Sequence, residues 1–429
     1  MRKTNKTICV VGLGYIGLPT AAIFASRKVK VVGVDVNQHA VDIINRGQIH
    51  IVEPHLDRVV HTAVTEGYLR ATTKIEPADA FLIAVPTPFK EGPTGPHDPN
   101  MEYVKSASKS VAAVLKTGDL VILESTSPVG ATQQMAAWLA EARPDLTFPQ
   151  THGETSDVRI AYCPERVLPG QVLCELVQND RVIGGMTPKC SAAAALLYKI
   201  FVKGECIITN ARTAEMCKLT ENSFRDVNIA FANELSIICD KLGINVWELI
   251  KLANRHPRVN ILQPGPGVGG HCIAVDPWFI VSAAPKEARL IRTAREVNDS
   301  KPEWVIDKVK LAVADYLLAN STKSAKDVII SCFGLAFKPD IDDLRESPAL
   351  EIVRKIALVH PGSVYAVEPN ISKLPVELKP TKVKLIDSEK AFFDSNVIVL
   401  LVDHMPFKQL TAARSSTRII IDTRGIWAA

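Results

Sequence analysis

The sequence predicts an α/β protein in which two Rossmann-like, doubly wound domains are joined by a central helical domain. Three observations lead to this prediction: a strand–turn–helix–strand unit at residues 7–35, a strongly helical stretch from about Thr213 onward, and a second alternation of strands and helices at residues 326–402. Such alternation is typical of parallel sheets covered by helices. The chain of 429 residues is longer than one hydrophobic core usually serves. We expect domains at residues 1–205, 206–310 and 311–429.

The first unit contains a complete dinucleotide-binding motif. The strand Thr7–Val11 leads into the turn Gly12-Leu13-Gly14-Tyr15-Ile16-Gly17, a helix follows, and a second strand ends at Asp35. The first glycine makes a tight turn, the second admits the pyrophosphate, and the third lets helix and strand pack closely. Asp35 can hydrogen-bond a ribose hydroxyl and would repel a 2′-phosphate. We therefore predict that the chain binds NAD, with contacts from Gly12, Gly14, Tyr15, Ile16, Gly17 and Asp35.

Further strands of the first domain end in polar turns. The strand at residues 80–85 leads to Thr87, and the strand at residues 120–124 leads to Thr126. Ligands of open parallel sheets bind at the carboxyl ends of strands, so both threonines are candidates for cofactor contact. Either hydroxyl could instead cap the next helix.

A rigid charged loop follows the next predicted strand and reads Pro164-Glu165-Arg166-Val167-Leu168-Pro169-Gly170. Glu165 could orient a water molecule, and Arg166 could face a phosphate. The alternative is an exposed ion pair of little energetic value.

The helical middle carries a polar face. Lys218, Asn222 and Arg225 stand at positions i, i+4 and i+7, so they share one side of a helix. A lysine, an amide and a guanidinium together suit an anion and sugar hydroxyls, although such a face is usually only solvated. An apolar stripe is predicted on the same helix from Val227, Phe231, Leu235 and Ile238.

A single cysteine stands in a loop too rich in glycine for ordinary core. The segment Pro264–Pro277 contains four glycines before Cys272, and Asp276 follows four residues later. Glycine lets the backbone pass close to a ligand. We interpret Cys272 as a nucleophile, the alternative being a small packed hydrophobe.

The third domain repeats the β/α alternation without the glycine motif. Its first turn, residues 334–346, carries Lys338 and Arg345, which could serve phosphate and ribose. Adjacent basic residues and the lack of a partnering histidine favour ion pairs over a metal site for its aspartates, which are Asp340, Asp342 and Asp343.

Composition narrows the class of protein. The net charge of +4 is small and no block of like charge occurs, so we expect no nucleic-acid partner. Nine cysteines without CxxC pairs favour reduced thiols and a cytosolic protein. The apolar run near the N-terminus is interrupted by the glycine turn, so we expect neither a signal peptide nor a membrane span.

Five motifs now stand in order: the glycine turn, Pro164-Glu165-Arg166, the Lys218/Asn222 helix, Gly269-Gly270-His271-Cys272, and Phe337-Lys338-Pro339-Asp340. Together they resemble the UDP-glucose/GDP-mannose dehydrogenase family over essentially the whole chain. The resemblance implies an oxidoreductase with NAD in the first domain, a UDP-sugar largely in the third, and a homodimer formed through the long central helix. This family oxidises a sugar's primary alcohol to a carboxylate while reducing two NAD.

The resemblance also implies residue roles. Cys272 attacks the intermediate aldehyde, and the resulting thiohemiacetal becomes a thioester that water hydrolyses. Lys218 shuttles protons or stabilises an oxyanion, Asn222 assists, and Asp276 supports the site. Water or protons are oriented by Glu165 and Thr126. The implied substrate contacts are Arg166, Val167, Lys218, Asn222, Arg225, His256, Gly269, Phe337 and Lys338. Arg258 is implied to reach the partner subunit's site, and Arg345 the cofactor side.

The segment at residues 255–272 is most similar to the branch of the family that oxidises UDP-N-acetyl-D-mannosamine. That branch supplies a uronic acid for bacterial surface polysaccharide, notably enterobacterial common antigen. One alternative is another UDP-sugar 6-dehydrogenase, acting on UDP-glucose or UDP-N-acetylglucosamine. The other is a catalytically silent regulator that binds NAD and a nucleotide sugar, against which the presence of Lys218, Asn222 and Cys272 argues.

Overall fold

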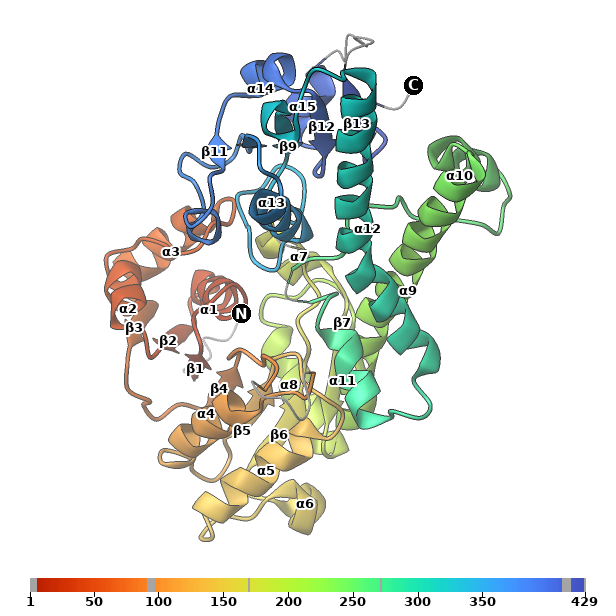
Figure 1. The fold of residues 1–429 in the computed structure, drawn as a ribbon. Coiled ribbons are helices and arrows are strands. Elements are labelled where there is room, and N and C mark those ends of the chain that lie inside the picture. The colour runs from red at the N-terminus through yellow and green to blue at the C-terminus, as the bar shows by residue number, and fades with distance from the viewer. Residues whose placement is uncertain (1–5, 91–96, 169, 271, 411–417, 428–429) are drawn as a thin grey trace. The chain divides into compact units, whose positions relative to one another are not determined.

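A computed structural model describes residues 6–90, 97–168, 170–270, 272–410 and 418–427. The chain divides into two compact units, residues 1–221 and 222–429 (Figure 1). The predicted fold class is confirmed, because each unit contains a Rossmann-like sheet and long helices occupy the middle of the sequence. Among the described residues no helix is long and apolar enough to cross a membrane.

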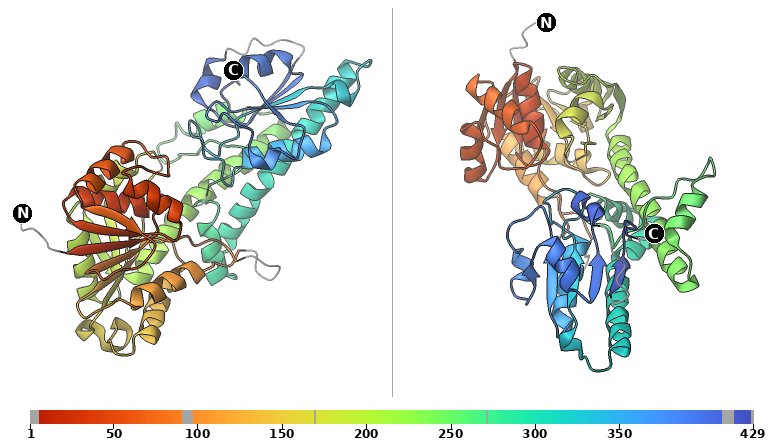
Figure 2. Two further views of the ribbon diagram at one scale, coloured as in Figure 1. Left: turned by 90° about the vertical axis from the view of Figure 1, so that its left-hand side faces the viewer. Right: turned by 90° about the horizontal axis from the view of Figure 1, so that it is seen from above.

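The first unit is built on an eight-stranded sheet in the order β3-β2-β1-β4-β5-β6-β7-β8. Every neighbouring pair is parallel except β6 and β7. The chain order reverses between β1 and β4, and such a reversal opens a ligand crevice at the carboxyl ends of the strands. Figure 2 shows this sheet as a fan of strands between helices. The strands are β1 (Thr7–Val11), β2 (Lys30–Val34), β3 (Leu69–Thr72), β4 (Ala80–Ile83), β5 (Leu120–Leu123), β6 (Arg159–Tyr162), β7 (Arg181–Gly185) and β8 (Cys206–Asn210).

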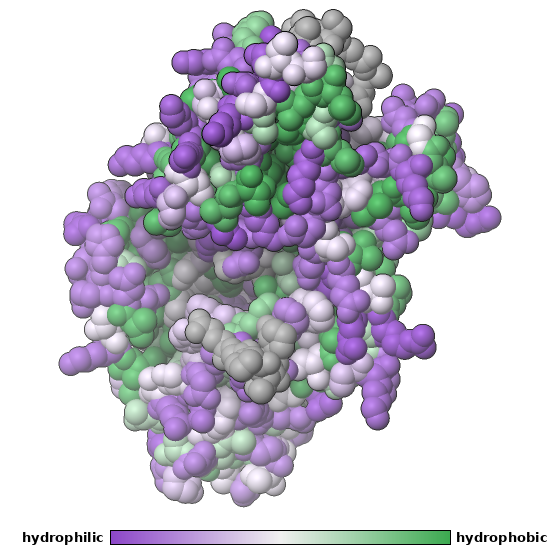
Figure 3. All heavy atoms as spheres, viewed as in Figure 1, coloured by the Kyte–Doolittle hydropathy of each residue, from purple (hydrophilic) through white to green (hydrophobic). Residues whose placement is uncertain are grey.

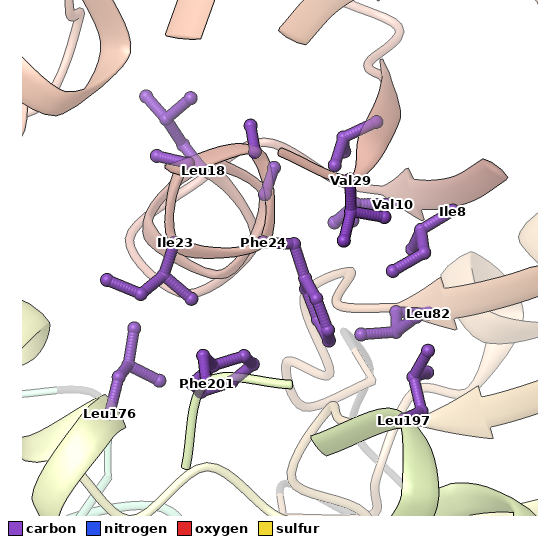
Figure 4. Close-up of a cluster of buried hydrophobic side chains, with 14 of the residues drawn as sticks. Ile8, Val10, Leu18, Ile23, Phe24, Val29, Leu82, Leu176, Leu197 and Phe201 are labelled. Carbon is purple, nitrogen blue, oxygen red and sulfur yellow. The ribbon is translucent and has the colours of Figure 1, made fainter. Parts of the chain in front are cut away.

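Two hydrophobic cores cover the faces of this sheet. Successive side chains of a strand point to opposite faces, so Ile8 and Val10 join the core beneath α1 while Cys9 and Val11 join the other. Figure 4 shows the first core, where Phe24 of α1 faces Leu82. The helices of this unit are α1 (Gly17–Ser26), α2 (Gln38–Asn45), α3 (Leu56–Thr65), α4 (Glu102–Ala112), α5 (Ala131–Ala142), α6 (Pro149–His152), α7 (Val172–Gln178), α8 (Pro188–Tyr198) and the start of α9 (Ala211–Leu242).

The second unit places a five-stranded parallel sheet, in the order β11-β10-β9-β12-β13, against long helices. Side chains of α12 and α13 form the core on one face of the sheet, and Phe333, Phe392 and Phe407 form a smaller one. Its elements after α9 are α10 (Val246–Ala253), α11 (Asp276–Ala283), α12 (Arg289–Ala319), β9 (Ile330–Phe333), α13 (Pro348–Val359), β10 (Val364–Val367), β11 (Lys384–Leu385), α14 (Ser388–Asp394), β12 (Val397–Leu400), α15 (Met405–Gln409) and β13 (Ile419–Asp422).

A buried polar network joins α9 to α12 within this unit. Arg295 donates to the Asp226 carboxylate at 2.6 Å, and the Asn298 amide donates to the same carboxylate at 2.8 Å. Asn233 in turn donates to the Asn298 side-chain oxygen at 2.8 Å. All four side chains are buried. Sliding one helix along the other would leave these buried polar groups unpaired, which costs free energy. The contacts therefore fix the register of α9 and α12 as well as holding the two helices together.

The three glycines of the first turn have different surroundings. A Cβ on Gly17 would lie 1.8 Å from the Gly12 carbonyl oxygen, and one on Gly12 would lie 2.6 Å from the Ala84 carbonyl oxygen. Gly12 also has a φ of 90°, which disfavours other residues. By contrast, a Cβ on Gly14 would meet nothing within 4 Å. Gly12 and Gly17 are therefore needed for folding, whereas Gly14 faces the open side of the turn, where a dinucleotide would lie.

This geometry predicts opposite effects for two matched alanine substitutions. Gly17→Ala should lower the free energy of unfolding by about 1–3 kcal/mol or more, the usual cost of forcing extra atoms into packed structure. Gly14→Ala should unfold at the wild-type temperature but bind dinucleotide more weakly. Thermal unfolding and a cofactor titration test both variants, and equal unfolding temperatures for the two would contradict this account of the turn.

Candidate functional site

Asp35 holds the glycine turn as well as facing the crevice. Its carboxylate accepts hydrogen bonds from the Leu13 backbone N–H at 2.8 Å and from the Asn37 backbone N–H at 2.9 Å. The side chain is half-buried at the end of β2. A carboxylate fixed beside the turn retains unused lone pairs that could accept from ribose hydroxyls. Tyr15 and Ile16, on the same turn, are also half-buried.

The structure brings the two predicted threonines together. The Thr87 hydroxyl donates to the Thr126 carbonyl oxygen at 2.6 Å, and Ser125 donates to the Val85 carbonyl oxygen at 2.7 Å. These bonds join the turns after β4 and β5. Neither threonine side chain makes the helix-cap contact considered from the sequence, since α4 and α5 have no side-chain cap hydrogen bond.

Glu165 and Arg166 do not form the exposed ion pair that the sequence left open. Glu165 is buried and accepts from Arg181 at 3.1 Å, while its other oxygen accepts from the Arg166 backbone N–H at 2.6 Å. The Arg166 guanidinium instead pairs with Glu221 on α9, at 2.6 Å. Val167, the next residue of the loop, is half-buried. The pairing differs from the expectation because partners distant in sequence lie closer than the neighbour.

Glu53 fixes the far end of the same loop. Its two buried oxygens accept from the backbone N–H groups of Gly170 and Val172, at 2.9 and 2.8 Å. The loop that carries Glu165 is therefore anchored at both ends.

The predicted polar face of α9 divides in two. Lys218 and Asn222 are buried, with Lys218 only 9% exposed, whereas Arg225 is exposed. Within the described part of the chain, the Lys218 ammonium forms no hydrogen bond or ion pair. Most of the Lys218 side chain is covered by protein, while its ammonium has no protein partner in the described chain and is available to a ligand group.

Two asparagines of α9 hold the cysteine loop at its two ends. Asn222 donates to the Asp276 carboxylate at 2.5 Å, and Asn233 accepts from the Gly265 backbone N–H at 2.8 Å. The two asparagines are 233 − 222 = 11 residues apart, which is about three helical turns, so they lie on the same side of α9. The loop is thereby fixed along one face of the helix.

Close packing fixes the middle of the cysteine loop. A Cβ on Gly269 would lie 2.5 Å from the Glu346 carbonyl oxygen, and one on Gly270 would lie 3.0 Å from the Phe337 ring. Cys272 itself is exposed and begins the turn that leads into α11, where its carbonyl accepts from the Asp276 N–H at 2.9 Å. The loop is closely packed at Gly269 and Gly270, and the exposure of Cys272 does not support the alternative of a packed hydrophobe.

The turn after β9 contributes a second part of this region. Phe337 packs against Gly270, Lys338 is half-buried, and Arg345 pairs with the Asp343 carboxylate at 2.6 Å. A cavity of about 700 Å³ opens here, between the N-terminus of α13, the body of α12 and the cysteine loop. Its lining includes Val268, Asn298, Leu344, Arg345, Ser347 and Glu351. Arg345 and the cysteine loop thus share one cavity.

His256 and Arg258 lie in an exposed turn after α10. The Arg258 backbone N–H donates to His256 Nδ1 at 3.3 Å. The structure leaves both side chains in solvent and does not bury them with Asn222 and Asp276.

Two of the three aspartates of the turn after β9 have protein partners in the described chain. Asp343 pairs with Arg345, and Asp340 accepts from the Met405 backbone N–H at 2.8 Å. Across the residues that the structure covers, no group of three or more His, Cys, Asp or Glu side chains is arranged to hold a metal ion.

Several residues of the site were not predicted from the sequence. Asn233 could have been found, because it repeats the position of Asn222 on the same helical face. Arg181, Glu124 and Glu53 could not, because their contacts with the Glu165 loop join elements that are distant in the sequence.

Comparison with known proteins covers the chain from end to end. Residues 6–202 match the NAD binding domain of the UDP-glucose/GDP-mannose dehydrogenase family, residues 212–300 its central domain, and residues 331–429 its UDP binding domain.

Full-length relatives are similar in sequence and in structure. The chain is 70% identical over 422 residues to the UDP-N-acetyl-D-mannosamine dehydrogenase of Yersinia pestis, covering 98% of this chain and 99% of that one. It is 63% identical over 424 residues to the NDP-N-acetyl-D-galactosaminuronic acid dehydrogenase of Ralstonia nicotianae, covering 99% and 97%. The solved structure of UDP-D-ManNAc dehydrogenase from Pyrococcus horikoshii is 39% identical with a TM-score of 0.85, covering 98% of this chain and 96% of that one. The three matched domains, in the order and with the motifs described above, show that the chain belongs to the UDP-glucose/GDP-mannose dehydrogenase family.

Proposed function

We propose that the protein oxidises the C6 primary alcohol of UDP-N-acetyl-D-mannosamine to the carboxylate, using two NAD per sugar. The dehydrogenase chemistry is supported by the exposed thiol of Cys272 and by Lys218, a largely covered lysine whose ammonium has no protein partner in the described chain. The choice of sugar rests on one observation, the 70% identity over 98% of the chain to the Yersinia pestis enzyme of that name.

The proposed mechanism divides a four-electron oxidation into two hydride losses. Bound NAD supplies the hydride acceptor for each. In the first, the C6 hydroxyl loses its proton and C6 loses a hydride, which leaves an aldehyde. The Cys272 thiolate then bonds to the aldehyde carbon and gives a thiohemiacetal, whose carbon can lose a second hydride to become a thioester. Water finally bonds to the thioester carbon, the carbon–sulfur bond breaks, and the thiolate is regenerated.

Each side chain has a role that its environment suits. Lys218 stabilises negative charge on the C6 oxygen and moves its proton, because a positioned cation without a protein counter-ion can act on a developing oxyanion. Asn222, held by Asp276, hydrogen-bonds the same oxygen. Glu165 and Thr126 orient the hydrolytic water. The remaining sugar-nucleotide contacts are assigned to Arg166, Val167, Arg225, His256, Gly269, Phe337 and Lys338, with Arg258 reaching the partner subunit's site.

The cofactor lies in the crevice of the first unit in this proposal. Gly14 has open space before it and Asp35 presents a fixed carboxylate beside it. Tyr15, Ile16, Thr87 and Thr126 are assigned to the remaining cofactor contacts, and Arg345 is assigned to the cofactor on the family resemblance alone. This assignment uses the domains 1–205 for NAD, 206–310 for catalysis and dimerisation, and 311–429 for the UDP-sugar.

The cellular role that we propose is the supply of a uronic acid for bacterial surface polysaccharide, in particular enterobacterial common antigen, from the cytoplasm. All nine cysteines lie in the described residues and none forms a disulfide, which suits a reducing compartment.

A second sugar is favoured by a specific observation. The Ralstonia nicotianae relative, at 63% identity, is named for N-acetyl-D-galactosaminuronic acid. N-acetylmannosamine and N-acetylgalactosamine are stereoisomers that differ in configuration at C2, which carries the acetamido group, and at C4. Because a few contacts distinguish such isomers, sequence identity in this range does not separate the two substrates on physical grounds.

A panel of nucleotide sugars tests the substrate. We expect NADH absorbance to rise fastest, in kcat/KM, with UDP-N-acetyl-D-mannosamine, compared with UDP-N-acetylgalactosamine, UDP-N-acetylglucosamine and UDP-glucose. A higher kcat/KM for any of the other three would overturn the choice of sugar. Binding of NAD without turnover of any sugar would instead favour the silent regulator.

Replacement of the proposed nucleophile should separate the two oxidations. Cys272→Ser should bind NAD and substrate but yield at most about one NADH per active site, because only the second oxidation requires the sulfur adduct. Wild-type enzyme should yield two NADH per sugar released. Cys174→Ser, which replaces the other exposed cysteine, is the matched control and should behave as wild type. Repeated full turnovers by Cys272→Ser would rule out the thioester.

The homodimer is proposed from an unpartnered face of α9. Phe224, Phe231 and Ile238 recur at intervals of seven residues and are 68%, 57% and 44% exposed. Of the apolar stripe predicted from the sequence, Phe231 and Ile238 are exposed, whereas Val227 and Leu235 are half-buried. Figure 3 likewise shows hydrophobic residues at the surface over α10, which follows α9. Large apolar side chains in a line on one helix are typical of a contact between copies.

Sedimentation tests this surface. Wild type should sediment as a dimer, and Phe231→Asp should shift it toward monomer because a buried carboxylate is costly at an apolar interface. Leu318→Asp, at a comparably exposed leucine on α12, is the control that should remain dimeric. A monomeric wild type would contradict the proposal.

A further inference from the structure

Behind Glu165 lies a buried charged cluster that the proposed mechanism does not use. Arg181, at the start of β7, donates to Glu165 at 3.1 Å and lies 4.0 Å from the carboxylate of Glu124, which follows β5. Its guanidinium also stacks over the Tyr198 ring, with 4.8 Å to the centroid. All four side chains are buried, and Glu124 is 1% exposed.

Glu124 is incompletely satisfied in this cluster. One oxygen accepts from the Tyr198 hydroxyl at 2.5 Å, while the other, Oε2, is buried without a hydrogen-bond partner in the described chain. Arg181 is the cation shared by Glu124 and Glu165. Two buried carboxylates beside one guanidinium cannot both be fully compensated. The protonation state of one carboxylate therefore affects how strongly the Arg181 guanidinium stabilises the negative charge of the other.

We propose that Glu124 is a positioning residue which competes with Glu165 for Arg181 and thereby controls how strongly the Glu165 carboxylate acts on the hydrolytic water. With Glu124 neutral, the guanidinium compensates Glu165 alone, and the carboxylate polarises water weakly. With Glu124 ionised, the guanidinium is shared and Glu165 retains more of its negative charge for water. The inference rests on the proposed role of Glu165 in thioester hydrolysis.

The surroundings of Glu124 raise its pKa toward neutral pH. Burial raises the pKa of Glu124 to about 7, and the negative charge of Glu165 acts in the same direction, whereas Arg181 and the Tyr198 hydroxyl lower it. The buried Cys163 thiol also faces the cluster, with its Sγ 3.8 Å from Arg181, and its pKa is raised to about 12 by burial, so it stays protonated when Glu124 titrates. A pKa of about 7 would let Glu124 change charge near neutral pH, beside a guanidinium that it shares with Glu165.

In the hydrolytic step the water oxygen bonds to the thioester carbon and a water proton passes to Glu165. The Cys272 thiolate leaves, and no oxidant or reductant takes part. A weaker Glu165 slows this step without affecting either hydride loss. The consequence is specific: the thioester accumulates on Cys272 when Glu124 is neutral.

The first test compares pH profiles. Wild-type kcat with NAD and UDP-N-acetyl-D-mannosamine should rise between about pH 6 and pH 8, and intact-protein mass spectrometry should show less thioester at the higher pH. Glu124→Gln keeps the shape and the acceptor for Tyr198 but fixes the neutral form. The kcat of this variant should not rise between about pH 6 and pH 8. At pH 8 the variant should retain thioester and turn over roughly three- to tenfold more slowly than wild type.

Two further variants distinguish charge control from structural damage. Tyr198→Phe removes a hydrogen bond that favours ionised Glu124. The rise of kcat with pH should therefore move to higher pH in this variant and should not disappear. Asp119→Asn is the matched control, because Asp119 is a buried carboxyl at the opposite end of β5 whose pKa is also raised by burial. It should leave the pH profile unchanged.

Stability provides a readout that does not depend on substrate. A carboxyl whose pKa is higher in the folded than in the unfolded chain binds more protons when folded, so stability falls as pH rises between about 4.5 and 7. The unfolding temperature of Glu124→Gln relative to wild type should therefore increase with pH across this window.

The outcomes separate the two proposals. An active wild type whose pH profile survives Glu124→Gln unchanged would overturn this inference and leave the proposed function intact. The same holds if the variant stalls before the thioester forms. A wild type that turns over none of the sugars would contradict the proposed function and, with it, the role of Glu165, even if the stability measurement showed that Glu124 titrates.

Discussion

The attachment of the cysteine loop to one face of α9 is the constraint on which the second unit depends. Asn222 and Asn233 hold Asp276 and Gly265, so the loop between them cannot move away from the helix without leaving buried polar groups unpaired. Asn233 also belongs to the network that joins α9 to α12. The helix pair and the loop that presents Cys272 are therefore one cooperative structure, and the position of the thiol is set by side chains outside the loop itself.

A comparable principle operates in the first unit, where acidic side chains hold the loops of the crevice. Asp35 accepts from the glycine turn, and Glu53 accepts from the end of the Glu165 loop. Glu215 accepts from the backbone of Gly130 and Thr132 at the start of α5. Carboxylates bind backbone N–H groups strongly, so these loops are held by contacts within the unit.

Much of this arrangement could be predicted from the sequence because it rests on local rules. The glycine turn, the strand that ends at Asp35 and the helix from Ala211 follow from residue spacing and backbone preference, and the structure contains all three. The loop carrying Cys272 was recognisable from its glycines, whose close contacts with Phe337 and Glu346 explain why no larger residue would fit. The family resemblance was confirmed by matches to all three domains.

The sequence by itself determined the fold class, the NAD-binding turn and the helical spacing that sets Lys218 one turn before Asn222, because these depend on neighbours within a few residues. Only the tertiary structure decided the ionic partners. Arg166 pairs with Glu221 and not with Glu165, and Arg225 is exposed although it shares a helical face with buried residues. Arg181 lies between Glu124 and Glu165, which follow the different strands β5 and β6. Charge pairing is decided by distance in space and by burial, and neither is encoded in the separation of residues along the chain.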